Sequence, residues 1–127
     1  MQTLTISKPD DFHLHLRDGA AMASIVNYSA AQFSRAIVMP NLRPAITTVD
    51  MALSYRERIL NSVDKKYNFE PLMTLYLTDN TLPDIINIAA QTESIKALKY
   101  YPAGTTTNSD CGVTDIKNIY SVLEAMM

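Results

Sequence analysis

One cysteine, two histidines and three glycines are all that this 127-residue chain contains of those residue types. Because Cys111 stands alone, the chain cannot form an internal disulfide, which agrees with a reducing compartment. No apolar run approaches the roughly 20 residues that span a bilayer, and the N-terminus lacks the basic and then apolar pattern of a signal peptide. No run of Lys or Arg is long enough to neutralise a phosphate backbone, and the net charge is -2. We therefore expect a cytoplasmic protein that binds neither a membrane nor nucleic acid.

Short apolar runs alternate four times with amphipathic segments along the chain. We expect strands at about residues 11–16, 36–39, 72–77 and 95–101, and a helix after each of them. The unbroken apolar run at 36–39 suits a strand that is buried on both faces, and Pro40 ends it. With 47% hydrophobic and 19% charged residues, the composition allows one domain with a buried core. The alternation is typical of βα units on a parallel sheet.

Capping signals and helical spacing indicate where the helices begin and which faces they bury. Thr47–Asp50 matches a capping box, Thr81–Asp84 opens the third helix, and Thr114 can cap the last one. The apolar positions at helical spacing are Met22, Ile25 and Val26, then Val49, Ala52, Leu53, Ile59 and Leu60, then Leu82, Ile85, Ile86 and Ala89, and finally Ile116, Ile119, Tyr120 and Leu123. The polar loop 102–113 is longer than a usual βα connection. Since the chain ends inside a helical pattern without a C-cap, we expect it to be part of a longer protein.

The only two histidines of the chain, His13 and His15, stand two residues apart in the first expected strand. Residues i and i+2 of a strand point the same way, with about 7 Å between their Cα atoms. Neutral imidazole is a preferred zinc ligand, so the pair can grip one metal ion without bending the backbone. The alternative is that two polar surface positions happen to share one face of the strand.

Three segments give this pair a context. They read Pro9-Asp10-Asp11-Phe12-His13-Leu14-His15-Leu16-Arg17-Asp18-Gly19, Met39-Pro40-Asn41 and Lys99-Tyr100-Tyr101-Pro102-Ala103. In residues, order and approximate spacing, the chain resembles dihydroorotases of the bacterial homodimeric type, which belong to the amidohydrolase superfamily. The resemblance spans nearly the whole chain and is far more specific than His-x-His alone.

The resemblance implies an α/β fold, the (β/α)8 TIM barrel of metal-dependent hydrolases. Residues 1–127 would form its first four βα units, as the N-terminal half of one barrel domain without a second domain. The implied enzyme is dihydroorotase, a cyclic amide hydrolase that carries out the zinc-dependent reversible cyclisation of N-carbamoyl-L-aspartate to L-dihydroorotate in de novo pyrimidine biosynthesis. Two Zn²⁺ ions per intact active site, a small-molecule substrate and a homodimer when intact are implied as well.

The resemblance also assigns metal ligands. It implies that His13 and His15 hold the more buried zinc and that Lys99 is carboxylated and bridges the two zinc ions. Strand alternation agrees, because it predicts that Lys99 shares a face with Ala97 and Ile95, whereas Lys96 lies on the opposite face. Without the resemblance, Lys99 would be interpreted as a solvated lysine at the end of a strand.

By the same resemblance, Arg17 and Asn41 bind the carboxylate of the substrate, which suits a forked guanidinium and an amide donor. Each has a plainer alternative, a surface ion pair for Arg17 and a turn after Pro40 for Asn41. Thr106 and Thr107 match threonines of a loop that closes over the substrate, against the alternative of a flexible polar loop. Asp18 is expected to cap or brace the first βα turn.

Part of the family's active site has no counterpart in this sequence. Two more histidines for the second zinc, another that positions the substrate, and a catalytic aspartate all come later in family members. Asp79 and Asp110 match no catalytic motif, so this chain contains no candidate for the catalytic base. We therefore expect the N-terminal portion of a dihydroorotase that is inactive alone. The alternative is a non-catalytic, dihydroorotase-like half-barrel that acts as a scaffold or binding module.

Overall fold

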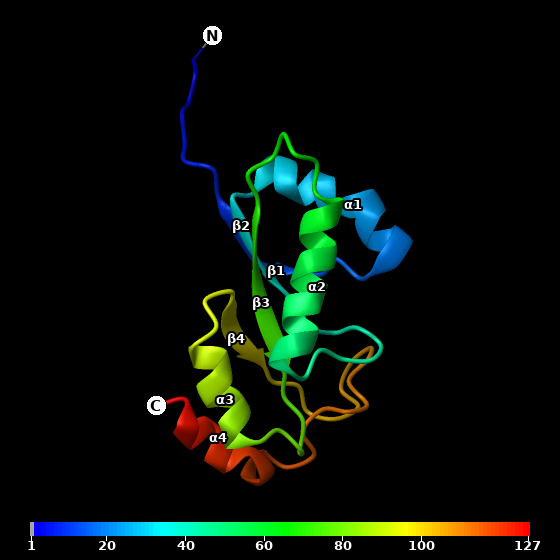
Figure 1. Cartoon of the computed structure of the whole chain (residues 1–127), viewed down its shortest axis with the longest axis vertical. Helices are drawn as coiled ribbons and strands as arrows, with labels where there is room; N and C mark the ends of the chain where they lie inside the picture. The colour runs from blue at the N-terminus through cyan, green and yellow to red at the C-terminus, as the bar shows by residue number, and fades with distance from the viewer. Residues whose placement is uncertain (1) are drawn as a thin grey trace.

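The computed structural model describes residues 2–127 as a four-stranded parallel sheet with helices against one of its faces (Figure 1). Met1, the first residue of the expected 1–127 domain, lies outside the described residues. The strands are β1 (Asp10–Leu14), β2 (Arg35–Val38), β3 (Glu70–Tyr76) and β4 (Ile95–Lys99). They are hydrogen-bonded in sequence order, all parallel, so β1 and β4 form the two edges.

A helical segment follows each strand, as the sequence pattern predicts. The segments are α1 (Gly19–Gln32), α2 (Val49–Ser62), α3 (Pro83–Ala90) and a 3-10 turn η1 (Ile116–Ile119) that leads into α4 (Tyr120–Ala125). Over residues 2–127, no helix is both long and apolar enough to cross a membrane. The four βα units of the sequence analysis are confirmed, with strand ends displaced by one to a few residues.

The core lies between the sheet and its helices. Ala36, Val38, Met73 and Leu75 are at most 1% exposed and pack in one cluster with buried residues of α1 and α2. On the opposite face of the sheet, Ile37 and Leu72 are only half-buried, whereas Thr74 and Tyr76 are buried. The sheet is therefore not buried evenly on both faces, contrary to what the apolar run at 36–39 suggested.

β4 carries an irregularity that the sequence did not reveal. Ile95 is paired with Met73, whereas Ala97 is paired with Thr74, so the register shifts between these pairs. Because neighbouring residues of β3 face opposite ways, Ile95 lies on the helix-covered face and Ala97 on the other. The expectation that Lys99 shares a face with both residues is thus correct for Ala97 and wrong for Ile95.

Three helix starts differ from their predicted caps. The N-cap of α2 is Thr48, whose hydroxyl accepts a hydrogen bond from the Met51 amide, one residue later than the box at Thr47 predicts. The last helical segment is capped by Asp115 rather than Thr114. At α3 the N-cap position is Leu82, which has no side-chain cap bond, and Pro83 occupies the first turn. Local spacing predicts a helix start only to within about one residue.

The buried stripe of each helix is narrower than helical spacing suggested. In α1 it consists of Met22, Val26 and Ala30, and in α2 of Ala52, Tyr55 and Ile59. Expected core residues that are instead exposed by 37% or more are Ile25, Leu53, Leu60, Leu82, Ile116, Tyr120 and Leu123. The reason is rotational, because a residue one position away from the buried stripe turns about 100° out of it.

The long loop after β4 returns to its own starting point. Pro102 and Val113 form an isolated bridge, and the Val113 amide donates to the Tyr101 carbonyl over 2.8 Å. Gly112 sits against this closure, where an added Cβ would lie 2.5 Å from the Tyr101 carbonyl oxygen. The loop is therefore a folded structure with a close backbone approach that requires glycine.

The corrected cap of α2 can be tested with two adjacent threonines. We expect Thr48→Ala to lower the free energy of unfolding by about 1 kcal/mol, because it leaves a first-turn amide without its side-chain acceptor. Thr47→Ala, the matched control, should cost less than half as much. Urea denaturation of both variants measures the difference, and an equal or reversed ranking would contradict the assignment of Thr48.

Candidate active site at the carboxyl ends of the strands

The carboxyl ends of parallel strands meet at one edge of a sheet, and most of the predicted site residues gather there. His13 lies in β1, and His15 and Arg17 follow closely in the chain. Asn41 comes shortly after β2, and Lys99 is the last residue of β4. The fold thus brings together side chains that are up to about 80 positions apart in the sequence, at the edge where such sheets hold their ligands.

The two histidines meet at their ring nitrogens. The Nε2 atoms of His13 and His15 are 3.1 Å apart, and the ring centroids are separated by 5.0 Å. Two imidazoles that bind one tetrahedral metal ion at about 2.0–2.1 Å would hold their nitrogens about 3.3 Å apart. The pair therefore fits a shared metal ion with little rearrangement.

Burial and nearby positive charges favour the neutral imidazole of His15, the form that a metal ion requires. Burial lowers the pKa of His15, and the positive charges of His13, Arg17 and Lys99 lower it further. Across residues 2–127, no three His, Cys, Asp or Glu side chains gather into a metal-binding group. This part of the chain thus brings two imidazoles and a lysine to the site, without a carboxylate ligand.

Lys99 is half-buried and lies on the face of the sheet opposite the helix-packed core. It is paired with Tyr76 of β3, and its Nζ atom lies 4.7 Å from the centre of the Tyr101 ring. Lys96 is exposed, as the sequence interpretation of a surface charge expects. The positive charge of Lys99 is the smallest of the contributions that lower the pKa of His15.

Arg17 and Asn41 line one cavity of about 590 Å³. Arg17 is exposed and forms no ion pair within residues 2–127, so its guanidinium remains available to an anion. Asn41 is only 4% exposed, and its side-chain oxygen has no hydrogen-bond partner among the described residues. An amide that is buried and incompletely bonded at a cavity wall is typical of a ligand contact rather than of a surface turn.

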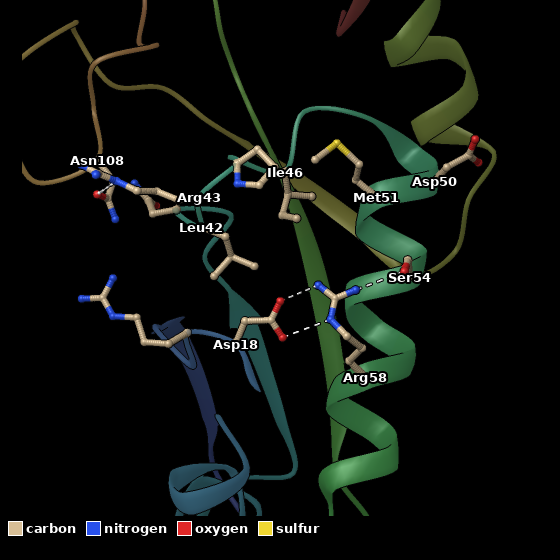
Figure 2. Close-up of a pocket in the computed structure, with 12 residues that line it drawn as sticks. Asp18, Leu42, Arg43, Ile46, Asp50, Met51, Ser54, Arg58 and Asn108 are labelled. Carbon is tan, nitrogen blue, oxygen red and sulfur yellow. Dashed lines mark hydrogen bonds and ion pairs between the residues drawn. The ribbon is translucent and has the colours of Figure 1, made fainter. Parts of the chain in front are cut away.

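The long loop reaches this cavity through a residue that the sequence analysis did not select. Thr106 and Thr107 are exposed, whereas Asn108 lines the cavity. The Asn108 side-chain oxygen accepts a hydrogen bond from Arg43 Nε over 2.6 Å, and its carbonyl accepts one from Tyr76. Figure 2 shows Arg43 and Asn108 meeting at one side of the cavity. No motif in the sequence marks either residue.

Asp18 lies at the opposite side of the same cavity (Figure 2) and braces the first βα turn, as the sequence predicts. Its carboxylate accepts a hydrogen bond from the Gly19 amide at the start of α1. It also receives two bonds from Arg58, whose Nε and Nη2 lie 3.0 and 2.8 Å from its two oxygens. These bonds, above all those from Arg58, hold the pKa of Asp18 below its usual value. The sequence analysis missed Arg58, since α2 offers several charged residues at equivalent spacing.

Curated proteins named dihydroorotase match nearly the whole chain. The relative from Delftia acidovorans is 60% identical over 124 residues, which cover 98% of this chain and 36% of the relative. The relative from Microcystis aeruginosa is 58% identical over 126 residues, or 99% of this chain and 37% of the relative. This chain therefore spans about a third of the length of the curated relatives it matches. No family model matches the chain.

Solved structures show the same relationship. A dihydroorotase from Campylobacter jejuni is 40% identical with a TM-score of 0.85 and covers 94% of this chain, which spans 35% of that protein. A dihydroorotase from Saccharomyces cerevisiae in complex with 5-fluoroorotic acid is 37% identical with a TM-score of 0.84, over 93% of this chain and 32% of that one. An L-hydantoinase from Arthrobacter aurescens, at 16% identity and a TM-score of 0.67, shares the fold over 91% of this chain and 26% of its own. The expected fold, four βα units of a TIM barrel, is confirmed.

The ion pair between Asp18 and Arg58 predicts a dependence of stability on pH. Because the pKa of folded Asp18 is lowered below 3.8, its contribution is complete above that value and is lost as the pH falls through the folded pKa. Asp18→Asn keeps a good N-cap, so we expect it to cost about 0.5–1 kcal/mol near neutral pH, given a half-exposed pair.

Urea denaturation at several pH values measures this cost, which should shrink on acidification. Asp115→Asn is the control, because Asp115 caps η1 through the Lys117 amide. A cost for Asp18→Asn that does not change with pH would contradict the role assigned to the ion pair.

Proposed function

We propose that this chain, which matches the N-terminal part of dihydroorotases, supplies the first metal ligands and the substrate-carboxylate contacts of a dihydroorotase active site. The reaction is the zinc-dependent reversible cyclisation of N-carbamoyl-L-aspartate to L-dihydroorotate, a step of pyrimidine biosynthesis. The substrate is thus a small dicarboxylic acid in one direction and a cyclic amide with one carboxylate in the other.

The observation that carries this proposal is the meeting of His13 and His15 at Nε2 atoms 3.1 Å apart, at the edge of the sheet that also holds Arg17. If the two histidines were a chance pair on the surface, there would be no reason for an arginine without an ion-pair partner to lie beside them. Nor would there be a reason for a lysine from the last strand to lie at the same end of the sheet. Their convergence is what metal-assisted hydrolysis of an anionic substrate requires.

His13, His15 and a carboxylated Lys99 would hold the metal. When bound, zinc polarises the amide carbonyl and makes a water molecule acidic enough to act as a nucleophile near neutral pH. The Lys99 amine gains its ligand oxygens by forming an N–C bond with carbon dioxide and releasing a proton. Its position as the last residue of β4, at the same end of the sheet as the two histidines, supports this role.

Arg17 and Asn41 would bind the substrate carboxylate. Arg17 can offer two parallel N–H donors, and the Asn41 side-chain amide can add another from a buried position in the same cavity wall. Thr106 and Thr107 would contact the substrate only after the loop moves, since both are exposed in this conformation.

The proposal includes features of the whole enzyme. Residues 1–127 would form the N-terminal half of a single barrel domain, and the remaining histidines and the catalytic aspartate would come from a part equivalent to the rest of the relatives. We also propose two zinc ions per active site, a homodimer and a cytoplasmic location. The similarity to dihydroorotases over 98% of the chain supports these points.

The test uses a chimera in which this chain replaces the matching third of the Delftia acidovorans dihydroorotase. We expect the chimera to hydrolyse dihydroorotate and to contain about two zinc ions per chain. His13→Ala and Lys99→Met should each lower kcat/KM more than about 100-fold and reduce the zinc content, because they remove direct ligands. Steady-state kinetics and metal analysis provide the measurements.

Lys96→Met is the matched control, since it removes a lysine from the same strand on an exposed position. It should leave activity and zinc content unchanged. Equal losses in the two lysine variants would argue against the proposed ligand. A folded chimera that binds no zinc and has no activity would contradict the proposed enzymatic function. It would favour the alternative, a non-catalytic scaffold or binding module.

A further inference from the structure

The turn that carries Arg17 has an unusual backbone. Arg17 adopts φ +63°, in the left-handed region that side chains with a Cβ atom rarely occupy. A non-glycine residue there costs about 1–2 kcal/mol, so contacts elsewhere must hold the turn in place. Gly19, at φ +56°, completes the turn at the start of α1 without such a cost.

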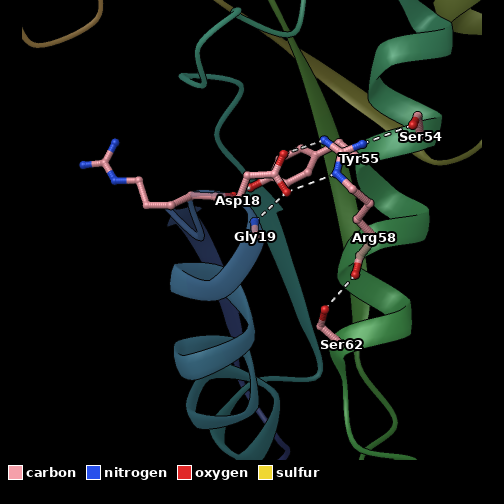
Figure 3. A network of polar contacts seen from close by, with 7 residues as sticks. Asp18, Gly19, Ser54, Tyr55, Arg58 and Ser62 are labelled. Carbon is pink, nitrogen blue, oxygen red and sulfur yellow. Dashed lines mark hydrogen bonds and ion pairs between the residues drawn. The ribbon is translucent and has the colours of Figure 1, made fainter.

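Two residues of α2 supply these contacts. The Tyr55 hydroxyl donates a 2.6 Å hydrogen bond to the carbonyl of Arg17 itself, and the Tyr55 side chain is fully buried. One turn further along, Arg58 binds both carboxylate oxygens of Asp18, the next residue of the turn. Figure 3 shows Arg58 between Asp18 and Ser54, with Tyr55 beside them.

The two contacts also support each other. The Arg58 guanidinium carbon lies 5.3 Å from the centre of the Tyr55 ring, within the range of a cation–π contact. Its Nη1 atom donates to the Ser54 hydroxyl over 3.1 Å, so all three guanidinium nitrogens of Arg58 have acceptors. Arg58, which also lines the cavity, is thereby fixed on α2 in its contact with Asp18.

We propose that Tyr55 and Arg58 are positioning residues for Arg17, which hold its strained turn so that the guanidinium points at the substrate carboxylate. This inference rests on the proposed function of Arg17. In this role both residues act through Arg17 rather than on the substrate itself. Tyr55 holds the Arg17 carbonyl, and Arg58 holds the side chain of the next residue, Asp18. The Arg17 side chain itself has no ion-pair partner in residues 2–127 to orient it. Carboxylate affinity therefore depends on a helix that lies outside the sheet.

The experiment is a double-mutant cycle in the chimera described above. Tyr55→Phe should raise KM for dihydroorotate about 3–10-fold, with kcat changed less than about 2-fold, because a carboxylate contact is kept in both ground and transition states. Arg58→Met should act in the same direction, and Arg58→Lys should recover part of the loss. Tyr28→Phe and Arg56→Met are the controls, an exposed tyrosine of α1 and a second arginine of α2, and should leave KM unchanged.

The decisive comparison repeats Tyr55→Phe and Arg58→Met in an Arg17→Met background. If both residues act through Arg17, their effects on kcat/KM should fall below about 2-fold there, because the side chain they position is gone. Initial rates at low substrate give kcat/KM even when saturation is out of reach. Effects that persist unchanged, or that appear in kcat and in the amount of folded enzyme alone, would overturn the inference and leave a structural role. Loss of activity in the unmutated chimera would instead contradict the proposed function.

Discussion

Parallel pairing of the four strands is the constraint on which the rest of the structure depends. Because β1 to β4 run in the same direction and in sequence order, their carboxyl ends lie along one edge. The segment that carries His13, His15 and Arg17 therefore meets Lys99 there, although no local signal links that segment to β4. The helices that make parallel connection possible cover one face of the sheet, and Lys99 lies on the other face.

Helix α2 both packs in the core and holds the turn that carries Arg17. The face of this helix that builds the core carries Tyr55, a buried residue whose hydroxyl ends on the Arg17 carbonyl. Arg58, on the next turn, remains partly exposed and binds Asp18. One side of α2 thus packs in the apolar core, and the adjacent side fixes the βα turn at Arg17 and Asp18. Asn108 of the long loop lines the same cavity as Asp18 and Arg58, and its side-chain oxygen accepts a hydrogen bond from Arg43.

Much of the fold could be predicted from the sequence, because period and composition are local properties. The four βα units, the capping role of Asp18 and the exposure of Lys96 all follow from neighbours within a few residues. The errors have equally physical origins. The bulge in β4 changes the face of Ile95 through cross-strand pairing, and the exposed Leu53 and Leu60 reflect how narrow a stripe of α2 meets the sheet. Neither is encoded in spacing alone.

By itself, the sequence determined which chemistry is present: two histidines two residues apart in an expected strand, an arginine beside them and a lysine at the end of a later strand. A residue type and a short spacing suffice for that. Only the tertiary structure decided that Asn41 is buried at the cavity wall, that Asn108 rather than its threonine neighbours reaches the cavity, and that α2 holds Arg17 in a left-handed turn. These depend on contacts between residues 32 to 65 positions apart, which exist only once the strands have paired and the helices have packed.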